Sequence, residues 1–306
     1  MRNFLSVADL STDEFQGVLD RALLLKEEIR QAKWRTDLAG KTVALLFQKP
    51  SLRTRVSFEQ GVRQLGGHAI YLSPAEVGLG ERESVPDVAR VLSRYVDGIV
   101  VRANRHADIE TLASFSSVPV INALSDLTHP CQALADLLTV REKKSRLAGL
   151  VMAYVGDGNN VAHSLILATA KAGVHLRIAC PSGFEPLATV VDSAAPDREI
   201  TGATLSVVRS PADAAAGADI LYTDVWTSMG QEAESENRRR AFAGYMIDMP
   251  LLKLANPDAI VMHDLPAHRG EEIADEVIDG PQSVVFDQAE NRLHAQKGLL
   301  SVIFTS

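Results

Sequence analysis

Cysteine, positive charge and long apolar runs are all scarce in this chain of 306 residues. Its two cysteines, Cys131 and Cys180, are too few for a small disulfide scaffold or a cysteine-based zinc site, and they favour a reducing compartment. With 31 lysines and arginines against 39 aspartates and glutamates, the net charge of -8 argues against a globally basic nucleic-acid-binding surface. No apolar run approaches the roughly 20 residues of a membrane span, and the N-terminus lacks the apolar core of a secretory signal. We therefore expect a soluble, cytoplasmic protein with no nucleic-acid and no membrane partner.

Length and composition predict a globular protein of two domains. At about 150 residues per domain, the length favours two domains or one large one. Hydrophobic residues make up 46% and charged residues 23% of the chain, which excludes a disordered or collagen-like protein. The sequence has no internal repeat and no low-complexity tract. A boundary near residues 143–149, after the charged run Arg141-Glu142-Lys143-Lys144, gives each half its own strands.

Short apolar runs alternate with longer amphipathic ones throughout, which is typical of an α/β fold with mostly parallel sheets. The predicted strands are residues 42–47, 69–72, 98–101, 118–122, 150–155, 174–180, 203–208, 220–223 and 259–263. The predicted helices are residues 53–65, 85–96, 130–140, 161–172 and 288–304. In such sheets ligands bind beyond the carboxyl ends of the strands, beside helix N-termini, so the residues that follow each strand are the candidates for a site.

The segment after the first strand has the composition of an anion site. Ser51 and Thr54 supply hydroxyl groups, and Arg53 and Arg55 supply forked donors suited to phosphate. A helix that starts here also offers unpaired N–H groups and its positive dipole end. Two arginines in the first turn oppose the dipole unless an anion is bound, so we favour an anion site over a capping serine with solvated arginines.

Two further segments of the first half follow strands. Arg102 comes after the strand at 98–101, a position where a single arginine is more often a surface residue. His129 and Gln132 lie within one turn at the start of the helix at residue 130. His129 is able to donate to a carbonyl oxygen and Gln132 to bond an amide. A capping histidine and a solvated glutamine explain the same residues equally well, so both readings stay open.

The second half offers groups that bind ammonium. Gly156-Asp157-Gly158-Asn159-Asn160 looks like a dinucleotide loop, but Val161 stands where the third glycine is needed, so NAD is a weak reading. Asp224 and Asp264 each follow a strand and meet if the strands are neighbours, although turn or cap roles are common for aspartate. An anion site in one half and ammonium-binding groups in the other suggest that a phosphorylated compound is joined to an amine across a cleft.

Five segments occur in the order seen in ornithine carbamoyltransferases, which the chain resembles over nearly its whole length. They are Ser51-Leu52-Arg53-Thr54-Arg55, His129-Pro130-Cys131-Gln132, Asp224-Val225-Trp226-Thr227-Ser228-Met229-Gly230, His263-Asp264-Leu265-Pro266 and Glu290-Asn291-Arg292. The first two are specific to the aspartate and ornithine carbamoyltransferase superfamily, and Ser228-Met229-Gly230 indicates the ornithine branch.

The resemblance implies a fold and an assembly. Two parallel-sheet, three-layer α/β domains are expected with a cleft between them. Residues 1–145 would bind carbamoyl phosphate, residues 146–287 would bind ornithine, and the C-terminal helix at 288–306 would return to the first domain. The family implies a homotrimer that needs neither a metal nor an organic cofactor.

The resemblance also assigns residues to the two substrates. Carbamoyl phosphate would be held by Ser51, the Leu52 backbone, Arg53, Thr54, Arg102, His129, Gln132, the Leu265 backbone carbonyl and Arg292. Among these, Arg102, His129 and Arg292 would polarise the carbamoyl oxygen and act catalytically. L-Ornithine would lie against Asn160, Asp224, Ser228, Met229 and Asp264. The neutral δ-amine would then attack the carbamoyl carbon, giving L-citrulline and phosphate.

Three residues depart from the family pattern. Asp264 replaces the usual cysteine, Gly78 stands where many relatives carry a glutamine, and Leu52 replaces the usual threonine, which matters less if the contact there is through the backbone. A carboxylate at 264 has four readings: it binds the ammonium too well and slows attack, it accepts the proton, it marks a different amine, or it points away.

These departures keep alternatives open. One is a carbamoyltransferase for another amine such as putrescine, although Asn160 and the Ser228-Met229-Gly230 segment favour ornithine. Another is an inactive or impaired homologue, although Arg53, Arg102, His129 and Arg292 are intact. A dehydrogenase is third and lacks the third glycine.

Overall fold

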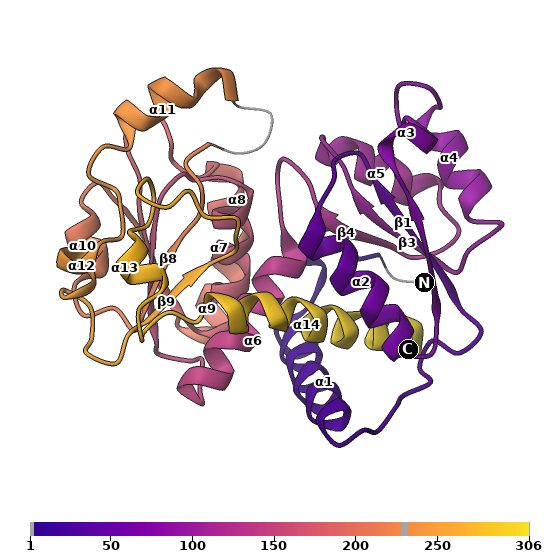
Figure 1. The fold of residues 1–306 in the computed structure, drawn as a ribbon, viewed down its shortest axis with the longest axis horizontal. Coiled ribbons are helices and arrows are strands. Elements are labelled where there is room, and N and C mark those ends of the chain that lie inside the picture. The colour runs from indigo at the N-terminus through magenta and orange to yellow at the C-terminus, as the bar shows by residue number, and fades with distance from the viewer. Residues whose placement is uncertain (1–2, 228–231, 306) are drawn as a thin grey trace. The chain divides into compact units, whose positions relative to one another are not determined.

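The computed structural model describes residues 3–227 and 232–305, which form two compact units (Figure 1). Unit 1 extends to Leu138 and resumes at Glu290, and unit 2 extends from Thr139 to Ala289. Each unit is built around one parallel sheet, as the alternation of apolar and amphipathic segments predicts. The α/β fold class is therefore confirmed.

The sheet of unit 1 has the strand order β2-β1-β3-β4, and all its pairs are parallel. Its strands are β1 (Thr42–Phe47), β2 (His68–Leu72), β3 (Gly98–Arg102) and β4 (Val120–Leu124). On β1, Ala44 and Leu46 join a core with α4 and α5, while Val43, Leu45 and Phe47, on the other face, are also buried. Helices therefore cover both faces, giving three layers.

The helical segments of unit 1 are short except for those at the two ends of the chain. They are η1 (Val7–Asp9), α1 (Thr12–Arg30), α2 (Leu52–Gln64), α3 (Pro74–Val77), α4 (Val85–Leu92), α5 (His106–Phe115), the start of α6 (Pro130–Lys144) and most of α14 (Val285–Thr305). The predicted helix at 85–96 ends earlier because Ser93 caps it, with its hydroxyl donating to the Ala89 carbonyl at 2.7 Å. Helix α1 was not predicted, although Ser11 and Glu14 form a capping box at its start.

The sheet of unit 2 has five parallel strands in the order β7-β6-β5-β8-β9. They are β5 (Val151–Val155), β6 (His175–Ala179), β7 (Leu205–Val208), β8 (Ile220–Thr223) and β9 (Ile260–His263). The remaining helical segments are α7 (Asn160–Ala172), α8 (Ala188–Ser193), α9 (Ala195–Thr201), α10 (Pro211–Ala215), η2 (Glu232–Glu234), α11 (Ser235–Ala241), α12 (Met249–Leu252) and α13 (Asp275–Ile278). All nine predicted strands are present, with ends that differ by no more than two residues.

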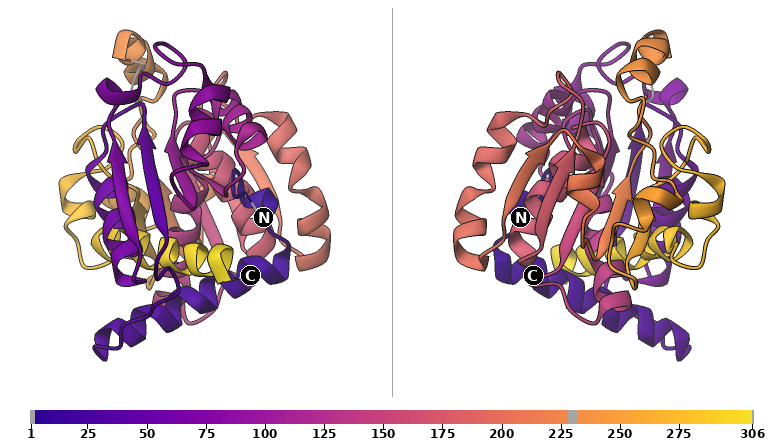
Figure 2. Two further views of the ribbon diagram at one scale, coloured as in Figure 1. Left: turned by 90° about the vertical axis from the view of Figure 1, so that its right-hand side faces the viewer. Right: turned by 90° about the vertical axis from the view of Figure 1, so that its left-hand side faces the viewer.

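Helix α14 packs against the N-terminal helices α1 and α2, as the resemblance implies (Figure 2). Lys26 of α1 donates to the Asn291 side chain at 2.8 Å, and both residues are buried. At Gly298 a Cβ atom would lie 2.7 Å from the Val18 carbonyl oxygen, so only glycine allows the backbones to approach this closely. These contacts join the two ends of the chain within unit 1.

A second lysine, Lys297, is buried where α14 packs, and we expect it to lower the free energy of unfolding. It is 1% exposed and donates to Gln64 Oε1 at 2.9 Å. Burial lowers the pKa of Lys297 to about 8, against a smaller opposing effect of Glu28. The amine is thus held in its charged form below pH 8 without a carboxylate close by, which costs folding free energy.

Replacing Lys297 with methionine should therefore stabilise the protein by about 2 kcal/mol at pH 7. Because the pKa is about 8 in the folded chain and 10.5 ordinarily, the unfolded chain binds more protons between these values. Wild-type stability should rise with pH across this window, so the advantage of Lys297→Met should shrink by pH 10. Urea unfolding at both pH values measures the change, and the exposed Lys253→Met is the matched control. An advantage that stays constant with pH contradicts this account.

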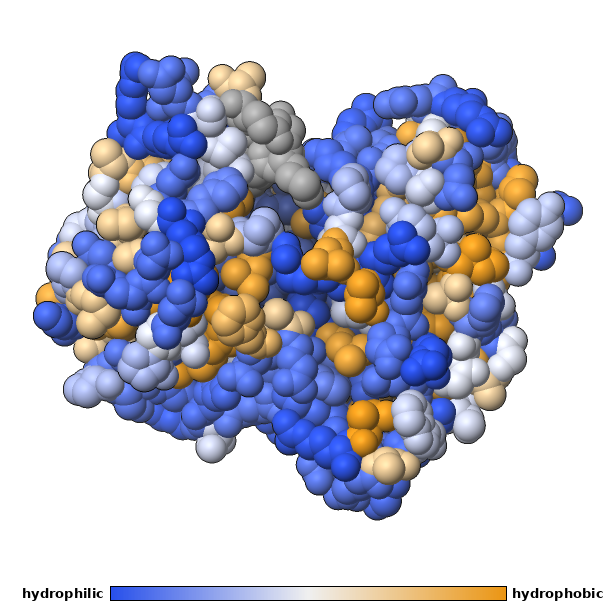
Figure 3. Space-filling model, in the orientation of Figure 1, coloured by the Kyte–Doolittle hydropathy of each residue, from blue (hydrophilic) through white to orange (hydrophobic). Residues whose placement is uncertain are grey.

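Exposed apolar side chains gather on α2 and β2 of unit 1. Leu52, Val56 and Ile70 are 75%, 53% and 42% exposed. Figure 3 shows apolar atoms over the α2 region, whereas the surface of α1 is mostly polar. Grouped exposure of this kind is typical of a contact surface.

Among the helices of residues 3–227 and 232–305, none is long and apolar enough to cross a membrane.

Candidate active site

The predicted anion segment lies between β1 and α2. Ser51 is the N-cap of α2, and its hydroxyl accepts the Thr54 N–H at 3.3 Å. The first turn has no acidic residue to offset its dipole. Arg55 bonds Glu59 at 2.9 Å, and its guanidinium lies over the Tyr71 ring. The Leu52 side chain is exposed.

Arg102 lies at the carboxyl end of β3, and His129 comes after the neighbouring strand β4. Both side chains are buried. Arg102 ends β3, pairs in register with Phe47, and is only 6% exposed, so it is not the surface arginine that its type suggests. His129 precedes α6 and is 4% exposed. Burial, followed by the charges of Arg292, Arg102 and Arg53, holds the pKa of His129 well below its usual range. The imidazole is therefore neutral and can donate one N–H in a strongly positive environment.

The Arg292 side chain links α14 to α2 and α6 through hydrogen bonds. It donates to Gln132 Oε1 at 2.5 Å and to Thr54 Oγ1 at 3.1 Å. Gln132 also donates from Nε2 to Asp136 at 2.8 Å and is 1% exposed, so it is not a solvated glutamine. The forked guanidinium thus fixes two polar side chains from α2 and α6, which a single ammonium group cannot do.

Position 78, where the chain departs from the family pattern, has a backbone conformation that favours glycine. It caps the C-terminus of α3 in the left-handed region, with φ +57°. A Cβ atom there would lie 2.8 Å from the Arg82 Cβ. Nearby, Gln48 donates from its side chain to the Leu79 carbonyl at 2.8 Å and ties this segment to the end of β1.

In unit 2 the loop that looks like a dinucleotide site is explained by packing. At Gly158 a Cβ atom would lie 2.2 Å from the Pro186 backbone nitrogen, so this glycine makes room for a neighbouring loop. Asn159, which was assigned no role, caps α7 by accepting the Val161 and Ala162 N–H groups. Its Nδ2 donates to Asp224 Oδ2 at 2.7 Å. Asn160 is the first residue of α7 and is partly exposed.

Asp224 and Asp264 follow neighbouring strands. Thr223 of β8 pairs in register with His263 of β9, so the next residue of each strand is an aspartate. Asp224 is 6% exposed and also accepts the Val225 N–H at 2.7 Å. Burial and then the Asp264 carboxylate raise the pKa of Asp224 well above its usual range.

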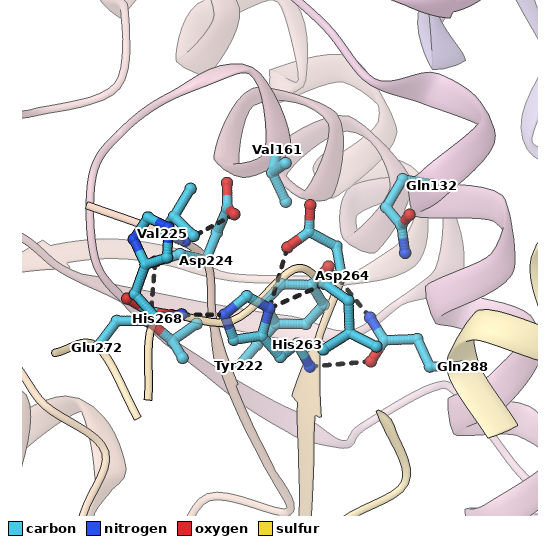
Figure 4. A network of polar contacts seen from close by, with 12 residues as sticks. Gln132, Val161, Tyr222, Asp224, Val225, His263, Asp264, His268, Glu272 and Gln288 are labelled. Atoms are coloured by element: carbon cyan, nitrogen blue, oxygen red, sulfur yellow. Dashed lines mark hydrogen bonds and ion pairs between the residues drawn. The ribbon is translucent and has the colours of Figure 1, made fainter. Parts of the chain in front are cut away.

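His263 connects Asp264 to a buried glutamate that the sequence did not reveal (Figure 4). Its Nδ1 lies 3.3 Å from Asp264 Oδ1, and its Nε2 lies 3.1 Å from Glu272 Oε1. Burial lowers the pKa of His263, but the hydrogen bonds of Asp264 and Glu272 outweigh it and raise the pKa to about 9. The Leu265 N–H faces the same nitrogen, Nδ1, at 2.9 Å, so this N–H and the Asp264 carboxylate compete for it.

The Gln288 side chain forms hydrogen bonds with residues near the ends of β9 and β8. Its Oε1 accepts the His263 backbone N–H at 2.9 Å, and its Nε2 donates to the Tyr222 hydroxyl at 3.2 Å (Figure 4). Leu265, whose carbonyl the resemblance assigns to a substrate, has φ +56°. A left-handed leucine is strained and persists where the surroundings fix it, as they often do at functional sites.

Ser228 and Met229 lie outside the described residues, but the segment that precedes them is held in place. Arg238, which no sequence motif marks, donates to Asp157 Oδ2 at 2.6 Å and to the Trp226 carbonyl at 3.0 Å. Arg238 and Asp157 are both 8% exposed. A buried arginine that bonds a backbone carbonyl fixes the chain two residues before Ser228.

Arg238→Met should destabilise the protein by about 3–5 kcal/mol, because it leaves the Asp157 carboxylate buried without a partner. The double variant Arg238→Met with Asp157→Asn should recover part of this loss. Thermal unfolding of both variants measures the effect. Equal destabilisation by the single and double changes would show that the packing of Arg238, and not its charge, holds the segment.

Histidine and carboxylate groups meet at two places in the described part of unit 2. Their possible ligand atoms lie within 4.8 Å of one another in the groups Asp224, His263, Asp264 and His268, Glu271, Glu272. Protein donors already engage them: Asp224 accepts two hydrogen bonds, and Glu272 accepts from the His268 backbone and faces His263. We assign no metal to either group.

Comparisons with known proteins identify relatives along the whole chain. The family model described as aspartate/ornithine carbamoyltransferase, carbamoyl-P binding domain, matches residues 2–142, and its Asp/Orn binding domain matches residues 148–303. Ornithine carbamoyltransferase of Acidothermus cellulolyticus is 55% identical over 304 residues, covering 99% of this chain and 96% of its own. That of Thermococcus kodakarensis is 51% identical over 302 residues, with 99% and 96% covered. The structure of the Pyrococcus furiosus enzyme matches with a TM-score of 0.97 and 49% identity, over 100% and 97% of the two chains.

Proposed function

Because the chain belongs to the aspartate/ornithine carbamoyltransferase family, we propose that it transfers the carbamoyl group of carbamoyl phosphate to the δ-amine of L-ornithine. The products are L-citrulline and phosphate, a step of arginine biosynthesis. The observation that carries the proposal is the similarity, along nearly the whole chain, to relatives named ornithine carbamoyltransferase. These relatives favour ornithine over putrescine and an active enzyme over an impaired homologue.

Unit 1 supplies the groups for carbamoyl phosphate. Ser51, the Leu52 backbone, Arg53 and Thr54 would hold the phosphate at the start of α2, where the helix dipole favours an anion. Gln132 would bind the carbamoyl amide, together with the Leu265 carbonyl. The buried arginines Arg102 and Arg292 and the neutral His129 would stabilise the carbamoyl oxygen as it becomes an oxyanion.

Unit 2 supplies the groups for ornithine. Asp224 and Asp264 would face the side-chain ammonium, and Asn160, Ser228 and Met229 would contact the rest of the amino acid. Asn159 would act through Asp224, since its hydrogen bond fixes that carboxylate. Attack needs the neutral amine, and most of the acceleration should come from positioning and from stabilisation of the oxyanion.

We extend the proposal to assembly and location, as a cytoplasmic homotrimer without a cofactor. The exposed Leu52, Val56 and Ile70 support a contact between copies over α2 and β2. Sedimentation equilibrium measures the state directly. A trimer in the wild type that dissociates in Val56→Glu supports this surface, and a monomer at micromolar concentration refutes it.

The proposed reaction is tested by citrulline formation from carbamoyl phosphate and L-ornithine across a pH series. Putrescine, L-lysine and L-aspartate serve as parallel acceptors. Turnover with ornithine alone is the expected result. Turnover with another amine in its place, or none from folded protein with any acceptor, would overturn the proposal.

A further inference from the structure

Gln48 connects three segments of unit 1 at the carboxyl end of β1. Its backbone N–H donates to the Arg102 carbonyl at 2.8 Å. Its side-chain Oε1 accepts the Asn104 N–H at 2.6 Å, and its Nε2 donates to the Leu79 carbonyl at 2.8 Å. Gln48 also lies three residues before Ser51, the N-cap of α2. One residue therefore links the start of the predicted anion segment to the end of β3 and to the segment that follows α3.

The backbone of β3 is irregular at the point where Gln48 bonds it. Val101 pairs with Asn122 of β4, but Arg102 pairs with Leu124, so the register shifts between the two residues of β3. A bulge of this kind re-aims a side chain and interrupts the ladder that would otherwise fix the strand end. The hydrogen bonds from Gln48 hold the chain here, one at the Arg102 carbonyl and one two residues later.

The Gln48 side chain lines a small cavity with a mostly apolar wall. The cavity has a volume of about 70 Å³ and is lined by Leu46, Phe47, Gln48, Pro74, Val77, Gly78, Leu79, Glu81 and Asn104. Packing in such a place needs no polar group, yet both ends of the half-buried amide bond backbone groups. Among uncharged side chains of this length, only glutamine offers both a donor and an acceptor at its end. The amide therefore serves the two hydrogen bonds and not the packing alone.

Arg102 and Arg53 come from different segments of unit 1, and the proposed function assigns both to the phosphate. Groups from separate segments bind one anion well only when their spacing is held to within about 0.5 Å. Resting on the proposed function, we propose that Gln48 is a positioning residue, which fixes the spacing between Arg102 and the start of α2 through its three hydrogen bonds. Gln48 acts through the arginine and through the turn at Ser51, and it needs no contact of its own with the substrate.

Gln48→Met tests this role without a change of charge, because methionine keeps the length of the side chain and removes both of its hydrogen bonds. The dissociation constant of inorganic phosphate, measured by isothermal titration calorimetry of the full chain at pH 8, should rise about tenfold. KM for carbamoyl phosphate should rise with it, while KM for L-ornithine should not change. The matched control is Gln31→Met, since Gln31 is an exposed glutamine of the same unit that bonds Glu27. It should leave phosphate affinity within about twofold.

Gln48→Glu separates hydrogen bonding from packing, because a carboxyl group donates to the Leu79 carbonyl only when it is protonated. This donation stabilises the neutral form and raises the pKa of the new carboxyl, as does the charge of Glu81 in the same cavity, whereas Lys49 and Arg102 lower it. The protonated side chain restores both hydrogen bonds. The ratio of variant to wild-type kcat/KM for carbamoyl phosphate should therefore rise about threefold from pH 8 to pH 5.5.

Asn104→Asp is the control for added charge. It places a carboxylate at the same cavity and keeps the backbone N–H that Gln48 accepts, so its ratio to the wild type should stay constant with pH. Wild-type phosphate affinity in Gln48→Met, or a constant ratio for Gln48→Glu, would overturn the positioning role. If Gln48→Glu does not fold, phosphate binding to Gln48→Met decides alone. A wild type that binds phosphate but makes no citrulline would instead refute the proposed function.

Discussion

Replacing His129 with alanine is expected to lower kcat for carbamoyl transfer by about 100- to 1000-fold. The imidazole is buried, and the three arginines around it keep it neutral, so it is suited to donate an N–H to the carbamoyl oxygen. That hydrogen bond strengthens as negative charge develops on the oxygen, so its loss should reduce kcat much more than it raises KM. Steady-state kinetics with saturating ornithine measures both parameters.

The pH dependence of this loss identifies the protonation state of His129. Because burial and the neighbouring arginines hold its pKa well below the usual range, the ring stays neutral from pH 6 to pH 9. The ratio of wild-type to His129→Ala rates should therefore be constant over that range. A ratio that changes below pH 7 would mean that the imidazolium contributes.

Two amide variants serve as controls, since a glutamine amide approximates the position of Nε2 and an asparagine amide that of Nδ1. One of His129→Gln and His129→Asn should recover part of kcat, which also identifies the donating nitrogen. If neither recovers activity while both variants fold, hydrogen-bond donation is not what His129 contributes.

Arg292→Lys is expected to reduce kcat/KM for carbamoyl phosphate by about 100-fold although the charge is kept. The guanidinium donates to Gln132 at 2.5 Å and to Thr54 at 3.1 Å, and these partners belong to different helices. A lysine ammonium is a compact charge on a flexible stem and cannot hold both groups in one geometry. Initial rates at varied carbamoyl phosphate concentration give the comparison.

Thr54→Val tests one of the two hydrogen bonds that the Arg292 guanidinium donates. It removes a single hydrogen bond from Arg292, so kcat/KM should fall only about three- to tenfold. Because Thr54 contacts Arg292, the double variant Thr54→Val with Arg292→Lys should lose little more than Arg292→Lys alone. Losses that multiply fully would show that the two residues act independently.

Local chemistry made most of the fold predictable. Runs of apolar residues bounded by turn residues predicted all nine strands, and Ser51, a residue type favoured at N-caps, stands at the start of α2. The strand ends shifted by one or two residues, as at β4, which is Val120–Leu124 and not 118–122. Strand ends depend on pairing with neighbouring strands, and that pairing is not written in the local sequence.

The residues that support the site were harder to predict. Asn159, Arg238, Glu272 and Gln288 carry no motif, and all but Glu272 bond a partner distant in sequence. Asn159 bonds Asp224 across 65 positions, and Arg238 bonds Asp157 across 81. Only Asn159 had a usable local signal, because asparagine before an apolar helix is a common N-cap.

The amino-acid sequence by itself determined the α/β alternation, the helix start at Ser51, the family and the residue types available for each substrate. It did so because propensity, capping and hydrophobic period act over a few residues. Only the tertiary structure decided that Arg292 reaches Thr54, 238 positions away, and Gln132, 160 positions away. It also decided that Asp224 lies beside Asp264, because the order β5-β8-β9 makes their strands neighbours. Charges interact through distance and burial, and both are set by the packing of segments remote in the chain.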